Sequence, residues 1–284
     1  MMANETRECN RICHTLQEQP AKQASEGGKT IITDTFDVVV VTSPDASAAR
    51  AAEEGPLQQF ALRHISTHDP YNTRCGSGGG TIAAMMLCEE HETVLIVHAG
   101  GESSRCPTQM VLGKSWTSLP CRNLNSESTK KDVKIQTPTS IIVKQLECML
   151  SGIPKGSVVV ACSDTLLQLP TSPSINWNQH SKSVIGVAVP APLSTAKNHG
   201  VYVLPTDTEK KQDELTIQPV MEFLQKPSVG KLKETPGATF LKGEGKEEFA
   251  WIDTGIVIFL PPAVQALRNL ALNELSCCCW DGIR

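Results

Sequence analysis

Two glycine clusters in this 284-residue chain offer the chemistry of a phosphate site. The first is the segment 76–81, which contains Gly76, Gly78, Gly79 and Thr81. The second directly follows the apolar run 94–98: it begins with Gly100 and Gly101, continues through Ser104 and Arg105, and leads to Lys114. Glycines let backbone N–H groups approach an anion without a Cβ in the way, and the two cations neutralise its charge. The pattern predicts a binding site for a polyphosphate.

Each cluster also has a simpler interpretation. Residues 76–81 could form only a tight turn, but they precede a helix-like stretch at 82–88, so their N–H groups could face an anion from a helix N-terminus. Residues 100–114 could form a solvated surface loop, but such a loop does not require two glycines directly behind a buried strand. We favour the binding interpretation for both clusters.

Asp164 is the candidate metal ligand. It follows the apolar run 158–161, where a lone carboxylate is costly to bury unless it binds a cation or caps a helix. Helix capping is a competing interpretation, because residues 165–167 could begin a helix with Asp164 as its N-cap. Magnesium prefers few carboxylates together with phosphate oxygens, which fits one aspartate beside a triphosphate. We therefore expect Asp164 to bind Mg²⁺.

Three further segments carry polar residues next to apolar runs: Asn198 to Gly200, Lys226 before a proline, and Asp253 before Thr254. By residue type alone, each has an ordinary alternative, since a lysine is usually solvated and the other two segments could be turns. Their positions beside apolar runs keep them as candidates for ligand contact.

The elements that must position these residues are short and strongly apolar. Runs without polar alternation occur at 36–42, 94–97, 158–161, 184–189, 201–204 and 255–260, and segments of helical length lie at 48–62, 81–88 and 141–150. Such runs are typical of parallel strands buried on both faces. The alternation predicts an α/β fold, a three-layer sandwich around a mostly parallel central sheet. Ligands of such sheets bind beyond the carboxyl ends of the strands, where the candidates stand.

The remaining segments are expected to be surface or disordered. Residues 122–137, 206–218 and 231–248 are predicted to be loops, the last a lid or binding loop. Residues 1–30 are polar and predicted to be disordered, and no internal repeat or second domain is evident in 31–284.

The composition of the chain limits the kinds of partner that it is expected to bind. A net charge of −4 and a pI near 6.0 give no overall attraction to nucleic acid or membrane, so a small anion is the expected partner. No apolar stretch approaches the roughly 20 residues of a membrane span. Most of the 11 cysteines are scattered singly, which favours reduced thiols in the cytosol. A metal site at Cys9, Cys13 and His14 is disfavoured because no second ligand pair follows at zinc spacing.

With these segments assembled, the chain resembles the GDP-L-fucose pyrophosphorylase and L-fucokinase family, a branch of the sugar nucleotidyltransferases. The resemblance runs from about residue 36 to 258 through the segments 76–81, 98–105, 112–114, 198–201, 224–227 and 252–256. It implies a Rossmann-like nucleotide-diphospho-sugar transferase fold for 31–284. It also implies that GTP and L-fucose 1-phosphate react with Mg²⁺ to give GDP-L-fucose and pyrophosphate.

The resemblance also implies roles for individual residues. Arg105 would hold the β- and γ-phosphates and Lys114 would stabilise the α-phosphate, while Asp164 carries the metal. The nucleotide would be bound by Gly76, Gly78, Gly79, Thr81, Gly100, Gly101 and Ser104. Asn198, Gly200 and Lys226 would face the sugar phosphate, and Asp253 would take a sugar hydroxyl or a second metal position.

The chain departs from the family pattern at its end. Family members continue into a β-helical region, and the bifunctional ones into a sugar kinase domain, whereas this chain stops at Arg284. We therefore expect it to be a piece of a longer parent protein. Two alternatives stay open: a non-catalytic or regulatory domain of a bifunctional L-fucokinase, and an enzyme for another sugar 1-phosphate. Retention of Arg105, Lys114 and Asp164 favours the enzyme.

Overall fold

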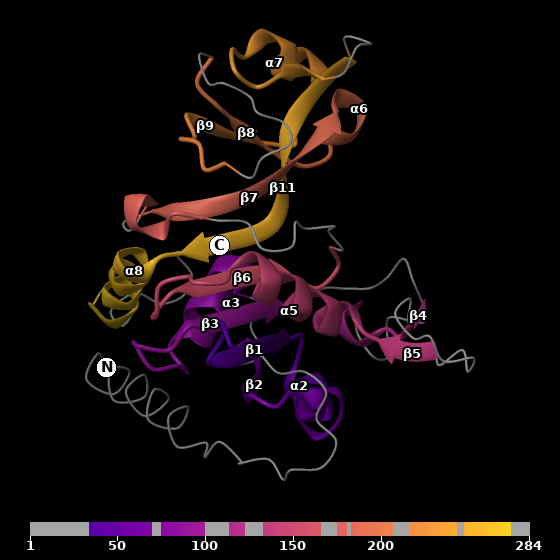
Figure 1. The fold of residues 1–284 in the computed structure, drawn as a ribbon, viewed down its shortest axis with the longest axis vertical. Coiled ribbons are helices and arrows are strands. Elements are labelled where there is room, and N and C mark those ends of the chain that lie inside the picture. The colour runs from indigo at the N-terminus through magenta and orange to yellow at the C-terminus, as the bar shows by residue number, and fades with distance from the viewer. Residues whose placement is uncertain are drawn as a thin grey trace, which may run out of the picture. The chain divides into compact units, whose positions relative to one another are not determined.

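The computed structural model describes residues 34–69, 75–99, 114–122, 133–165, 175–180, 183–206, 216–242 and 247–273. The chain forms two compact units: unit 1 comprises residues 1–183 and 259–284, and unit 2 comprises residues 184–258 (Figure 1). The segment 31–284, assigned from the sequence to a single nucleotidyltransferase domain, contains unit 2 and most of unit 1, and that assignment stays a prediction. No helix in the described ranges is long and apolar enough to cross a membrane.

Unit 1 contains a parallel sheet of valine-rich strands. Its strands are β1 (Val38–Ser43), β2 (Arg63–His68), β3 (Val94–His98) and β6 (Val158–Cys162), in the spatial order β2-β1-β3-β6. Every neighbouring pair is parallel. The prediction of a mostly parallel central sheet is confirmed for these strands.

Both faces of this sheet are covered. Side chains of one parity in β1, β3 and β6 form a core cluster with α3 (Gly76–Met85) and with Val264 of α8 (Pro261–Asn273). Residues of the opposite parity, Val39, Leu95 and Val159, are also fully buried. Further buried side chains come from α2 (Ala46–Glu54), the 3-10 helix η1 (Pro56–Gln59) and α5 (Pro138–Met149). Successive strand side chains point to opposite faces, so the sheet is enclosed as an α/β sandwich requires.

Several elements of unit 1 differ from expectation. Strand β2 was not foreseen, and α3 begins at Gly76, so the first glycine cluster lies inside a helix. The helix expected over 48–62 ends at Glu54 because Gly55 and Pro56 follow, and η1 replaces its second half. The predicted loop 122–137 is bounded by an antiparallel pair, β4 (Leu119–Arg122) and β5 (Val133–Gln136), and residues 123–132 lie outside the described residues. Two short 3-10 helices, η3 (Lys114–Trp116) and η4 (Trp177–His180), also belong to the described part of unit 1.

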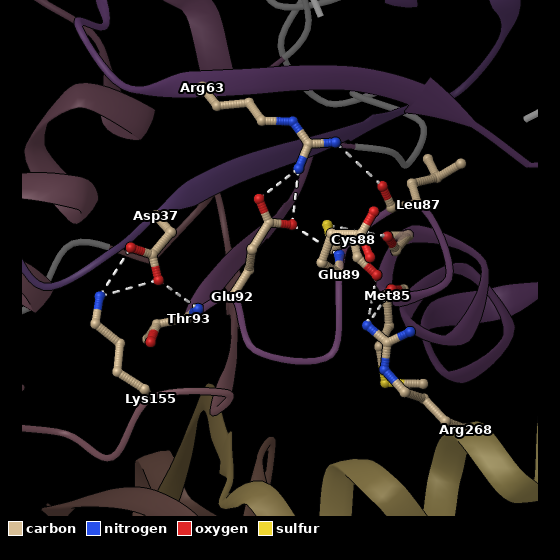
Figure 2. A network of polar contacts seen from close by, with 11 residues as sticks. Asp37, Arg63, Met85, Leu87, Cys88, Glu89, Glu92, Thr93, Lys155 and Arg268 are labelled. Carbon is tan, nitrogen blue, oxygen red and sulfur yellow. Dashed lines mark hydrogen bonds and ion pairs between the residues drawn. The ribbon is translucent and has the colours of Figure 1, made fainter. Parts of the chain in front are cut away.

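Polar contacts tie the amino-terminal edge of the sheet (Figure 2). Arg63, at the start of β2, donates to both oxygens of Glu92 at 2.6 and 2.7 Å, just before β3. Asp37, before β1, accepts from the Thr93 N–H and from Lys155 Nζ, both at 2.8 Å. Burial alone would raise the pKa of Asp37, but these partners lower it overall, so the carboxylate stays ionised. This edge is therefore occupied by structural contacts.

Unit 2 is built mainly from antiparallel strands. They are β7 (Val184–Pro192), β8 (Gly200–Val203), β9 (Glu222–Gln225), β10 (Phe240–Lys242) and the long β11 (Glu247–Phe259), whose last residue belongs to unit 1. Strand β11 is antiparallel to both β8 and β10 and also pairs with β7, while β8 is antiparallel to β9. Strand β9, which ends just before Lys226, lies at the edge of the sheet.

One face of the unit 2 sheet packs against two short helices, α6 (Leu193–Ala196) and α7 (Val229–Glu234). Leu193, Val201, Leu224, Leu232 and Ile252 belong to the shared core cluster. The prediction that 231–248 is a loop is wrong for about half of its length, because parts of α7, β10 and β11 lie in it and Leu232 is fully buried. Residues 243–246 lie outside the described residues.

Candidate functional site

The carboxyl edge of the unit 1 sheet brings several candidate segments together. Because the strands are parallel and in register, Thr42 of β1 lies beside His98 of β3, and His98 lies beside Cys162 of β6. Asp69 follows β2, and Asp164 follows β6 by two residues. This is the edge at which open parallel sheets bind ligands. His98 and Cys162 therefore lie side by side at this edge, close in sequence to Asp164.

The glycine cluster forms the first turns of α3. Gly76 has a φ of 69°, which favours glycine, and Gly78 is exposed with nothing within 4 Å of where a Cβ would lie. A glycine inside a helix costs about 0.5–1 kcal/mol relative to alanine, and packing does not require Gly78. The first turn of a helix also leaves N–H groups without intrahelical partners. These features are compatible with an anionic ligand at the start of α3.

Thr81 does not direct its hydroxyl to solvent. The residue is 7% exposed, and its Oγ1 lies 2.9 Å from Nε2 of His98. Its predicted part in nucleotide binding stays a prediction, but the structure gives the hydroxyl a protein partner.

Asp69 links the end of β2 to the start of α3. Its Oδ2 accepts from the Cys75 N–H at 3.2 Å, and its Oδ1 accepts from Cys75 Sγ at 2.9 Å. Burial, followed by the hydrogen bond and charge of Asp69, raises the pKa of Cys75 to about 12. The thiol is therefore a protonated donor at neutral pH, and it fixes the N-terminus of the glycine helix.

Lys114 and Asp164, both predicted site residues, contact one another. Lys114 Nζ donates to Asp164 Oδ2 at 2.8 Å, and the two side chains are 29% and 48% exposed. Burial alone would raise the pKa of Asp164, but the hydrogen bond and charge of Lys114, with a hydrogen bond from Cys162, lower it overall. A partly exposed pair of this kind contributes only about 0–1 kcal/mol. The Asp164 carboxylate thus stays ionised, and exchanging the partners of this pair for a ligand costs little.

In unit 2, the predicted sugar-phosphate residues lie at one end of the β8–β9 pair. The Asn198 N–H donates to the Thr195 carbonyl at 3.0 Å in the turn that leads to Gly200, and Gly200 pairs with Gln225. The Lys226 N–H donates to the carbonyl of His199 at 3.0 Å. Lys226 has a φ of 47°, the single positive value for a residue other than glycine within the described ranges. Such strain is often retained at functional sites.

The Asp253 side chain of β11 already accepts hydrogen bonds from protein groups. Its Oδ1 accepts from the Tyr202 hydroxyl at 3.1 Å and from the Gly255 N–H at 3.0 Å. Burial, then the nearby Asp253 charge, raises the pKa of Tyr202, so the hydroxyl stays protonated and donates. Gly186 makes room for this contact, since a Cβ there would clash with the Tyr202 oxygen. A sugar or metal role for Asp253 stays a prediction.

Four predicted residues, Gly100, Gly101, Ser104 and Arg105, lie outside the described residues, as do Cys9, Cys13 and His14. The helix that Asp164 would cap also falls mostly outside them. Within the described ranges, no group of three or more histidine, cysteine, aspartate or glutamate side chains is arranged to hold a metal. The magnesium role of Asp164 stays a prediction.

Sequence reasoning missed the residues that organise this edge: His98, Thr42 and Asp69. A signal was present for two of them, since a histidine and a threonine each end an otherwise apolar run. A polar side chain at the carboxyl end of a buried strand must find a partner or face a ligand.

A parallel α/β sheet with a glycine-rich helix start and a lysine–aspartate pair at its carboxyl edge is typical of proteins that bind phosphorylated ligands. The family model of the fucose pyrophosphorylase domain matches residues 90–279, more than half of the chain. The chain belongs to this family. The match begins after the first glycine cluster, so 76–81 lies outside it.

Curated relatives agree with this assignment. The chain is 25% identical to fucose-1-phosphate guanylyltransferase of Mus musculus over 80% of its own length and 39% of the relative. It is 25% identical to the Homo sapiens protein of the same name, covering 72% of the chain and 34% of the relative. The bifunctional fucokinase/GDP-fucose pyrophosphorylase of Arabidopsis thaliana is 24% identical, covering 78% and 23%. The chain thus spans well under half the length of each.

Proposed function

We propose that this chain is a nucleotidyltransferase that makes GDP-L-fucose and pyrophosphate from GTP and L-fucose 1-phosphate in the cytosol, with Mg²⁺. Family membership and the names of the relatives support the reaction class. The observation that carries the proposal is the contact between Lys114 and Asp164, which lies at the sheet edge where a ligand is expected. The contact brings together the Lys114 ammonium group, which suits a phosphate, and the Asp164 carboxylate, which suits a metal ion.

In the proposed reaction, an oxygen of the sugar phosphate attacks the α-phosphorus of GTP, and the bond from that phosphorus to the bridging oxygen of pyrophosphate breaks. Catalysis of such a step is mostly positioning and charge neutralisation. Lys114 leaves Asp164 and stabilises the charge that develops on the α-phosphate, and Arg105 binds the β- and γ-phosphates. Asp164 would hold Mg²⁺, which would offset the charge of the triphosphate oxygens when bound.

The remaining candidates bind the two substrates. The N–H groups at Gly76, Gly78 and Gly79 face the nucleotide. The second glycine cluster, with Gly100, Gly101 and Ser104, contacts its phosphates. Asn198, Gly200, Lys226 and Asp253 contact the sugar phosphate. A Rossmann-like, three-layer nucleotide-diphospho-sugar transferase fold is part of the proposal, and the enclosed parallel sheet of unit 1 supports it.

The test is pyrophosphate release by the purified chain. We expect release from GTP only when both L-fucose 1-phosphate and Mg²⁺ are present. Lys114→Ala should lower kcat by about 100-fold or more, the scale of losing one transition-state donor. Lys155→Ala is the matched control: this lysine pairs with Asp37 at the opposite edge of the sheet, so its loss should leave kcat unchanged.

A panel of nucleoside triphosphates and sugar 1-phosphates separates the alternatives. Turnover with another sugar, such as D-arabinose or a hexose 1-phosphate, would correct the substrate and keep the reaction. Nucleotide binding without turnover on any sugar phosphate would instead mark a non-catalytic domain of a longer kinase.

A further inference from the structure

One side chain, His98, connects three elements at the candidate site. His98 ends β3, and its Nδ1 lies 2.9 Å from Oγ1 of Thr42 at the end of β1. Its Nε2 lies 2.9 Å from Oγ1 of Thr81 in α3. The imidazole therefore spans from the sheet to the helix that starts with the glycine cluster.

Both hydroxyls that meet the imidazole are buried, since Thr42 and Thr81 are each 7% exposed. Burial lowers the pKa of His98, against the opposing effect of the Asp69 carboxylate, so the ring is neutral near pH 7. A neutral imidazole has one donor and one acceptor nitrogen, and here each nitrogen has a hydroxyl partner. No ring nitrogen is left to exchange a proton with a substrate, so the contacts point to positioning and not to acid–base catalysis.

The backbone around His98 also makes hydrogen bonds to the ends of the neighbouring strands. The Ala99 N–H donates to the Thr42 carbonyl at 2.9 Å, and the His98 carbonyl accepts from the Ser163 N–H at 3.1 Å, next to Asp164. Gly80 of α3 faces the ring, since a Cβ added there would be in ordinary van der Waals contact with His98 Cε1 at 3.5 Å. The same residue thus contacts the ends of β1 and β6 and the first turns of α3.

We propose that His98 is a positioning residue that holds the glycine-rich start of α3 against the carboxyl ends of β1 and β3 and thereby sets the affinity for GTP. The inference deepens the proposed function and depends on it for the identity of the ligand. The structural part of the inference is that an imidazole between two threonines fixes the start of α3, and it follows from the contacts alone.

Two measurements on the full chain test the inference: hydrogen exchange without ligand, and GTP binding with Mg²⁺ by calorimetry. In His98→Gln and in Thr42→Val, amides of residues 76–85 should exchange faster, while those of α5 keep their rates. The dissociation constant for GTP should rise about tenfold in His98→Gln, the effect of losing roughly one net hydrogen bond. Thr93→Val, a buried threonine at the other end of β3, serves as the control and should leave both measurements unchanged.

The double variant Thr42→Val/His98→Gln tests whether Thr42 affects GTP binding through its contact with His98. If Thr42 acts through His98, the double variant binds GTP no more weakly than His98→Gln alone, because contacting residues are not additive. Normal exchange at 76–85, or unchanged GTP affinity in folded His98→Gln and Thr42→Val, would overturn the inference. A wild-type chain that binds no GTP would overturn the proposed function, and hydrogen exchange would still decide whether His98 holds α3. Should His98→Gln fail to fold, the nearly isosteric Thr42→Val carries the test.

Discussion

At the carboxyl edge of the unit 1 sheet, two of the described polar side chains are neutral. The Cys75 thiol is protonated and the His98 ring is neutral, because burial opposes a charge on either group. Asp69 accepts two hydrogen bonds from Cys75. Among the described residues at this edge, Lys114 and Asp164 form a partly exposed ion pair whose chemistry suits a phosphate and a metal ion.

The lowered pKa of His98 predicts a pH dependence of stability. An unfolded histidine takes up a proton as the pH falls through about 6.5, whereas His98 in the folded chain resists protonation until a lower pH. The unfolded state then binds more protons, so the free energy of unfolding decreases as the pH falls below about 6.5. We expect the stability advantage of wild type over His98→Gln in urea unfolding to be full at pH 8 and smaller at pH 5.5. An advantage that is constant or grows toward acid pH would contradict the neutral buried ring.

At the level of residues, the sequence pointed to charged side chains, whose chemistry is evident from their type. It did not point to side chains whose role depends on their partners in the fold. Lys114 and Asp164 were predicted because a cation and a carboxylate follow apolar runs, and they lie in contact. His98 was missed because its role depends on Thr42 and Thr81, which are distant in sequence and meet it only in the folded sheet.

Among the elements, fully apolar strands were the most predictable. Strands β1, β3 and β6 consist almost wholly of buried aliphatic residues, whose pattern has few alternatives. Strand β2 was missed because its sequence, Arg-His-Ile-Ser-Thr-His, has no apolar run, and as an edge strand it is only partly buried. The start of α3 was missed because glycine disfavours helices, and contacts with Asp69 and His98 override that preference.

The glycine helix gives a prediction in which stability and binding change in opposite directions. Gly78 is exposed within α3 and a Cβ there meets no neighbour, so Gly78→Ala should stabilise the chain by about 0.5–1 kcal/mol. If the backbone at this position approaches the nucleotide, the new methyl group should at the same time weaken GTP binding. Urea unfolding and calorimetry on the same variant measure the two effects. A more stable variant with unaltered GTP affinity would remove Gly78 from the nucleotide site.

At the scale of the whole molecule, unit 1 is completed by residues from both sides of unit 2. Helix α8 follows β11 in the chain, and its Val264 belongs to the core cluster of β1, β3 and α3. Arg268 of α8 is 6% exposed, and its Nη2 donates to the carbonyls of Met85 at 3.1 Å and Cys88 at 2.7 Å, as Figure 2 shows. These carbonyls lie at and just beyond the C-terminal end of α3, where a helix lacks internal partners and favours a cation.

The two ends of α3 are thus held by different parts of the chain: Asp69 and His98 near its start, and Arg268 at its other end. Replacing Arg268 by methionine keeps much of the aliphatic stem but leaves the Met85 and Cys88 carbonyls without their charged donor. Because hydrogen bonds to charged groups contribute about 1.5–3 kcal/mol, Arg268→Met should lower the free energy of unfolding by about 2–3 kcal/mol. Arg50→Met, at an exposed position of α2, is the control and should change it little. Equal urea midpoints for the two variants would show that α8 does not stabilise α3; a selective loss in Arg268→Met would show that unit 1 requires the segment that follows unit 2.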